Sequence, residues 1–110
     1  MANRVLVVGW DGADWDILDP LLATGELPAL QELIIRGQRG VSRSCLPSHS
    51  WAAWPTSLTG RDPGGHGVFD ILEHRPGATR RLPVSYRSIL APTWADRLAE
   101  AGKTTLLLNV

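Results

Sequence analysis

Runs of apolar residues mark three segments of the chain as candidate β-strands. Residues 4–8, "RVLVV", hold a continuous apolar run that ends at Gly9, a pattern typical of a strand buried on both faces of a sheet. Residues 104–110, "TTLLLNV", have the same character and predict a second buried strand. The segment Gly40–Ser44 is a further candidate.

Proline, glycine and capping residues delimit the predicted helices. Asp19 and Pro20 have the order of an N-cap and a first helical residue, and the short apolar patch after them stops at Gly25. Thr93 and Asp96 have the spacing of a capping box, which predicts a helix that ends at Gly102. Two more helices, each stopped by a glycine, are predicted over residues 28–36 and 50–59.

The remaining segments are predicted to be irregular. Residues 64–67 are expected to form a glycine-rich loop, and residues 73–88, with four arginines and no sustained period, an exposed insertion. Strands alternating with helices favour an α/β sandwich with a largely parallel sheet. Because the chain stops at Val110 on a strand of the buried type, we expect residues 1–110 to be the amino-terminal part of a single domain, truncated at Val110.

Charge and composition narrow the function classes. The chain of 110 residues has 11 basic and 11 acidic residues, interspersed along the sequence, which disfavours nucleic acid or an anionic membrane as the main partner. The apolar run at residues 5–8 is too short for a signal core or a membrane span, so a soluble, cytoplasmic protein is expected. A single cysteine excludes an internal disulfide framework.

Asp11 and Ser50 are the first candidates for chemistry. Asp11 follows the first predicted strand, and ligands of open α/β sheets collect at the carboxyl ends of strands. The alternative is that Asp11-Gly12 is an ordinary turn. Ser50 begins a predicted helix, where free N–H groups and the positive end of the dipole would stabilise an alkoxide or a phosphate. Its alternative role is an ordinary N-cap.

Other catalytic patterns receive less support. The sequence "SHSWA" around Ser50 lacks the G-x-S-x-G elbow of acyl-transfer enzymes, and the chain has no H-E-x-x-H, Walker or G-x-G-x-x-G motif. His66 is interpreted as a structural histidine bonded to backbone and not as a metal ligand. The five tryptophans are interpreted as core and pocket-wall residues.

The spacing of several motifs resembles one enzyme family. The motif "VVGWDG" precedes a P-A-L helix, and a hydroxyl residue stands nine positions before Thr59. The pattern "P-x-x-HG-V-F-D" follows, in which the family's positions are occupied by Pro63, His66, Gly67 and Asp70. This order resembles the type I phosphodiesterase and nucleotide pyrophosphatase branch of the alkaline phosphatase superfamily, over nearly the whole chain. The resemblance implies an alkaline-phosphatase-like three-layer sandwich.

The resemblance also implies roles for the two candidate residues. Ser50 stands at the position of the family's nucleophile, and Asp11 at the position of a metal ligand; Ser50 would also contact metal. The family binds two divalent ions, often zinc and in some members manganese, and its further ligands lie beyond residue 110. Ile71 occupies the position of an asparagine that contacts phosphate in nucleotide-hydrolysing members. "CLPSH" is similar to a sulfatase motif, but Cys45 lies five residues too early.

The sequence therefore predicts a metal-dependent phosphohydrolase, first of all a phosphodiesterase that attacks a small phosphate ester with Ser50 and forms a phosphoryl-serine intermediate. A phosphomutase of the same superfamily is the second hypothesis. The third is a noncatalytic α/β module that binds a ligand in a tryptophan-lined cleft. Residues 1–110 alone are expected to be inactive.

Overall fold

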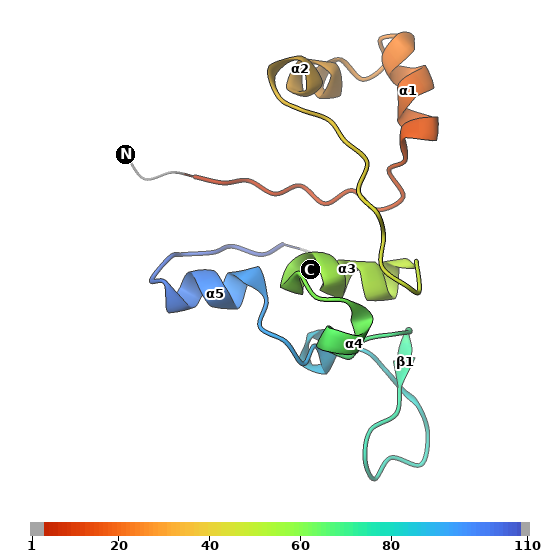
Figure 1. The fold of residues 1–110 in the computed structure, drawn as a ribbon, viewed down its shortest axis with the longest axis vertical. Helices are drawn as coiled ribbons and strands as arrows, with labels where there is room; N and C mark the ends of the chain where they lie inside the picture. The colour runs from red at the N-terminus through yellow and green to blue at the C-terminus, as the bar shows by residue number, and fades with distance from the viewer. Residues whose placement is uncertain (1–3, 109–110) are drawn as a thin grey trace. The chain divides into compact units, whose positions relative to one another are not determined.

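The computed structural model describes residues 4–108 and divides the chain into two compact units, Met1–Ser42 and Arg43–Val110 (Figure 1). Each unit has its own helices and is described by itself. No helix among residues 4–108 has the length and apolar character needed to cross a membrane.

The first unit is a pair of helices, α1 (Trp15–Ala23) and α2 (Pro28–Arg36), which contact each other. The carboxylate of Asp14 accepts the N–H of Asp16 at 2.9 Å and caps α1. The helix therefore begins four residues before Asp19, so the predicted start at Asp19-Pro20 is wrong and Pro20 lies inside the helix. The prediction for residues 28–36 is confirmed.

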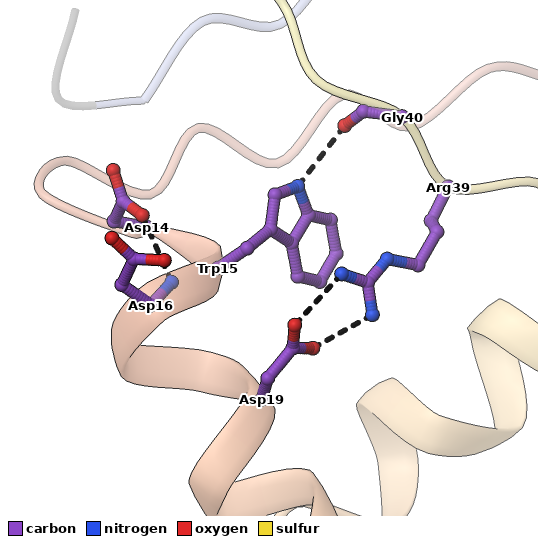
Figure 2. A network of polar contacts seen from close by, with 6 residues as sticks. All are labelled: Asp14, Trp15, Asp16, Asp19, Arg39 and Gly40. Carbon is purple, nitrogen blue, oxygen red and sulfur yellow. Dashed lines mark hydrogen bonds and ion pairs between the residues drawn. The ribbon is translucent and has the colours of Figure 1, made fainter.

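A polar cluster attaches the segment after α2 to the first turns of α1 (Figure 2). The indole Nε1 of Trp15 donates to the carbonyl of Gly40 at 3.0 Å. Arg39 forms two hydrogen bonds with the Asp19 carboxylate, at 2.7 and 3.0 Å, and its guanidinium carbon lies 3.9 Å from the centre of the Trp15 ring. The hydrogen bonds from Arg39 hold the pKa of Asp19 below its usual value.

The second unit carries the remaining elements. Its helices are α3 (Ser50–Thr59), α4 (Pro63–His66), the 3₁₀ turn η1 (Tyr86–Ser88) and α5 (Trp94–Glu100), and its strands are β1 (Leu72–Glu73) and β2 (Leu82–Pro83). Helix α3 contacts both α4 and α5. The strands pair antiparallel, with Leu72 opposite Pro83. Buried side chains gather around α3 and the segments that cover it: Ala52, Leu58, His66, Val68, Ala91 and Thr93.

Local capping accounts for the two longer helices of this unit. Helix α3 ends at Gly60, whose φ of +66° is the left-handed conformation favoured by glycine. Helix α5 begins with the predicted capping box, in which Thr93 accepts the N–H of Asp96 and Asp96 accepts the N–H of Thr93. The helices predicted over residues 50–59 and after Thr93 are both confirmed.

The strand predictions over residues 4–8 and 40–44 are wrong. Neither segment is a strand. In the first segment, the residues from Val5 to Val8 are between 67% and 87% exposed. Residues 104–108 also form no strand, while residues 109 and 110 of that predicted strand lie outside the described residues. A strand requires a hydrogen-bonded neighbour, and β1 with β2 is the sole paired set between residues 4 and 108. This part of the chain is thus a mixed helix and strand fold without the predicted parallel sheet.

Two segments expected to be irregular contain short elements. Residues 63–66 form α4 because the carboxylate of Asp62 accepts the N–H of Gly65 at 2.8 Å, and Pro63 supplies the first helical residue. Residues 72–88 form the β1–β2 hairpin and η1. The predicted loop at residues 64–67 is therefore wrong in part, while the insertion at residues 73–88 is mostly exposed, as predicted, but contains regular elements.

Candidate functional site

Ser50 is the first residue of α3, and its side chain is exposed. The N-cap is His49, whose Nδ1 accepts the N–H of Ala52 at 3.4 Å while its carbonyl accepts the N–H groups of Ala52 and Ala53. The alternative that Ser50 is an ordinary N-cap is therefore wrong. Its hydroxyl stands at the positive end of the helix, where an anionic oxygen is stabilised.

The hydroxyls that follow Ser50 bond to the helix itself. Thr56 donates to the carbonyl of Ala52 at 2.9 Å, Ser57 to that of Trp54 at 2.8 Å, and Thr59 to that of Pro55 at 2.7 Å. These bonds place the threonine and serine side chains along the α3 backbone, where they satisfy carbonyl groups of the helix.

The tryptophans of α3 are not core residues. Trp51 is 49% exposed and Trp54 38% exposed, and Trp10 in the first unit is also exposed. The interpretation of the tryptophans as core residues is thus wrong for these three. Their exposed indoles are available for contact with a ligand or another protein surface.

His66 links α3 to α4 as a buried structural residue. Its Nδ1 accepts the N–H of Val68 at 3.2 Å, so the neutral ring carries its proton on Nε2, which lies 3.0 Å from the Thr56 hydroxyl. Burial lowers the pKa of His66, and the nearby Asp62 carboxylate opposes this shift more weakly. The prediction that His66 bonds to backbone is confirmed.

A cleft of about 490 Å³ lies beneath the β1–β2 hairpin. We call it the hairpin cleft; its walls come from three segments, between residues 67 and 76, 81 and 84, and 87 and 90. Apolar side chains such as Phe69, Leu72 and Val84 line it together with Arg75, Arg81 and Arg87. Its volume falls in the range of small-molecule pockets.

Two carboxylates of the hairpin cleft are held in place by neighbouring groups. Asp70 accepts the N–H of Ile71 at 2.7 Å and a hydrogen bond from Arg81 at 3.0 Å; these bonds, with a weaker contribution from the charge of His49, lower the pKa of Asp70. Glu73 accepts from the hydroxyl of Ser88 at 2.8 Å and pairs with Arg75, which lowers its pKa in the same way.

Asp11 belongs to the first unit and Ser50 to the second, and each is placed within its own unit. Asp11 is exposed in a turn, where the N–H of Ala13 approaches the carbonyl of Trp10 at 3.5 Å and Gly12 has a φ of +71°. A carboxylate and a hydroxyl are suitable oxygen ligands for a divalent ion. Between residues 4 and 108, no three residues among His, Cys, Asp and Glu gather into a group that could hold a metal.

Comparison with known proteins identifies the family. The family model of type I phosphodiesterase / nucleotide pyrophosphatase matches residues 5–104 of the chain. The chain belongs to this family. No curated protein and no solved structure matches.

Membership in the phosphodiesterase family supports hydrolysis of phosphate esters as the general activity, and the predicted resemblance is confirmed. The family generally binds divalent metals and acts on small phosphate esters.

Sequence reasoning missed the hairpin cleft of this chain. The signal was the cluster of four arginines between residues 73 and 88, which was interpreted as a solvated insertion. Three of those arginines line the cleft. Sequence reasoning also missed His49 as the N-cap of α3, because histidine is not among the residues preferred at that position.

Proposed function

We propose that the chain is part of a metal-dependent phosphodiesterase in which Ser50 is the nucleophile. One observation carries the proposal: Ser50 is the exposed first residue of a helix capped by its neighbour, in a chain matched to the phosphodiesterase family from residue 5 to residue 104. Because His49 supplies the cap, the Ser50 side chain is not required for that structural task. It can therefore serve the reaction.

The reaction has two displacements at phosphorus. The Ser50 Oγ forms a bond to phosphorus as the bond to one ester oxygen breaks, and the departing alcohol takes up a proton. The resulting phosphoryl-serine keeps the second ester group. Water then forms a new bond to phosphorus, the Oγ–P bond breaks, and Ser50 regains its proton. The positive end of the α3 dipole stabilises the negative charge that develops near Oγ.

Two divalent ions, zinc or manganese, would lower the pKa of the serine hydroxyl and stabilise charge on the phosphate oxygens. Asp11 and Ser50 are the residues proposed to contact them. The support for Asp11 is its exposed carboxylate in the turn before α1 and its place in the family's first motif. The described residues offer one carboxylate and one hydroxyl for this purpose, so the remaining ligands are proposed to come from beyond residue 110.

We further propose that residues 1–110 are the amino-terminal part of one alkaline-phosphatase-like domain, a three-layer sandwich with a largely parallel sheet. The support is the exposure of residues whose pattern is that of buried strands: Val5, Leu6 and Leu106 are each at least 80% exposed. Apolar side chains of this kind are stabilised when neighbouring strands and helices cover them.

Replacement of Ser50 tests the proposed function in the whole protein. Ser50→Ala is expected to reduce hydrolysis of bis(4-nitrophenyl) phosphate, assayed with zinc or manganese, by about a thousandfold or more, because the covalent route is removed. Ser57→Ala is the matched control, since the Ser57 hydroxyl donates to the carbonyl of Trp54 within α3; it should keep activity within about twofold. Turnover by a folded Ser50→Ala protein at the wild-type rate would rule out Ser50 as the nucleophile.

A further inference from the structure

The walls of the hairpin cleft are attached to the helix that carries Ser50. The hydroxyl of Thr56, on α3, lies 3.0 Å from Nε2 of His66, and the carbonyl of His66 accepts the N–H of Leu90 at 2.9 Å. His66 comes directly before Gly67, the first residue of one wall of the cleft, and Leu90 belongs to another wall. The cleft is therefore held at a fixed place against α3 within the second unit.

Asp70, which lines the cleft, is also influenced by the residue that caps α3. The hydrogen bonds from Ile71 and Arg81 are the main cause of the lowered pKa of Asp70, and the charge of His49 adds a smaller effect in the same direction. His49 immediately precedes Ser50, and Asp70 lines the cleft. The cleft and the helix that begins at Ser50 thus belong to the same unit.

The charges in the cleft leave one arginine without an acidic partner. Arg75 pairs with Glu73 and Arg81 with Asp70. Arg87 also lines the cleft, and among residues 4–108 its guanidinium makes no hydrogen bond or ion pair. A planar guanidinium in this position can bind a carboxylate or a phosphate through two parallel hydrogen bonds.

We propose that the hairpin cleft binds one ester group of the substrate, an apolar group that carries an anionic substituent, and that Arg87 recognises this substituent. The apolar walls at Phe69, Leu72 and Val84 suit the body of such a group, and the guanidinium of Arg87 suits its carboxylate or phosphate. This assignment rests on the proposed function, because Ser50 is taken as the point of attack. Arg87 therefore favours substrates whose ester group carries a negative charge.

A matched pair of substrates tests the assignment. The probes are 4-nitrophenyl 4-carboxyphenyl phosphate and the methyl ester of its carboxyl group, 4-nitrophenyl 4-(methoxycarbonyl)phenyl phosphate, which lacks the charge of the substituent. In the whole protein, Arg87→Gln is expected to raise the KM for the carboxylate substrate about tenfold, since it removes the charged hydrogen bonds. The KM for the methyl ester should change by less than about twofold.

The matched control is Arg80→Gln. Arg80 is an exposed arginine of the same hairpin that does not line the cleft, so its replacement should affect neither KM. An equal rise in both KM values for Arg87→Gln would indicate a general structural effect and overturn the proposal. Unchanged values for both substrates would also overturn it.

Calorimetric titration separates this proposal from the proposed function. The same two diesters are titrated into the Ser50→Ala protein and into the Ser50→Ala, Arg87→Gln double variant. The cleft proposal predicts that the second change weakens binding of the carboxylate diester alone. If the wild-type protein cleaves neither diester, the proposed function fails, while this titration still decides whether Arg87 binds the anionic substituent.

Discussion

At the scale of single residues, His66 shows how burial fixes both geometry and protonation. The imidazole is fully buried and bonds through Nδ1 to the N–H of Val68 and through Nε2 to the hydroxyl of Thr56. In the neutral ring with its proton on Nε2, Nδ1 accepts one hydrogen bond and Nε2 donates the other. A second proton on Nδ1 would remove the bond to the N–H of Val68. Folding therefore favours the neutral form.

This preference predicts how stability depends on pH. The pKa of folded His66 lies below its ordinary value of about 6.5, so the unfolded chain gains a proton first as the pH falls. The free energy of unfolding should thus be highest above pH 6.5 and decrease as the pH falls from 6.5 through the lower folded pKa. Urea unfolding of the whole protein at a series of pH values between 8 and 5 measures this decrease.

His66→Gln provides the comparison. The variant should be less stable by about 1–2 kcal/mol at pH 8, because it disturbs two buried hydrogen bonds. The stability gap between wild type and variant should narrow below pH 6.5, since only the wild type has the imidazole. A gap of constant size from pH 8 to pH 5 would show that His66 does not titrate differently in the two states.

At the scale of elements, the helices depend on local signals and the strands do not. Pro28 and Gly37 delimit α2, and Thr93 with Asp96 starts α5, so the sequence near each helix is enough to predict it. The strand predicted over residues 4–8 depends on partners distant in sequence, which the described residues do not provide. The start of α1 was misplaced because Asp14 was not recognised as its cap.

The capping box of α5 offers a quantitative test. Thr93 is buried, and its hydroxyl donates to Asp96 at 2.7 Å, accepts from the Asp96 N–H and lies 3.1 Å from the hydroxyl of Tyr86. Thr93→Ala removes these contacts and should lower the free energy of unfolding by about 2 kcal/mol. Thr93→Ser keeps the hydroxyl and should cost clearly less. Equal losses for the two variants would assign the effect to the methyl group and not to the cap.

At the scale of the whole molecule, the sequence predicts some parts of the candidate site and misses others. Ser50 was predicted correctly as the start of a helix because capping and glycine signals are local, and its chemical role remains a proposal. The sequence motif around Asp11 predicted a turn, and the structure has Asp11 exposed in a turn. The hairpin cleft could not be predicted from the sequence, because its walls come from separate segments of the chain. Two of these walls are brought together by the hydrogen bond from the N–H of Leu90 to the carbonyl of His66.

The role of Asp11 is tested by metal binding in the whole protein. Asp11→Asn is expected to weaken the affinity for zinc or manganese by about tenfold or more and to reduce activity, with partial recovery in excess metal, because an amide oxygen is a weaker ligand than a carboxylate. Asp16→Asn is the control, an exposed acid in the first turn of α1. Unchanged metal content in purified Asp11→Asn, measured by elemental analysis, would make Asp11 a turn residue only.

Trapping the covalent intermediate is the most direct test of the central claim, that Ser50 attacks phosphorus. The whole protein is mixed with bis(4-nitrophenyl) phosphate and metal, quenched in acid before the steady state, and digested for mass spectrometry. If Ser50 is the nucleophile, it will carry a nitrophenyl phosphoryl group, formed together with a burst of nitrophenolate. An adduct on a different residue, or a burst without an adduct on Ser50, would contradict it.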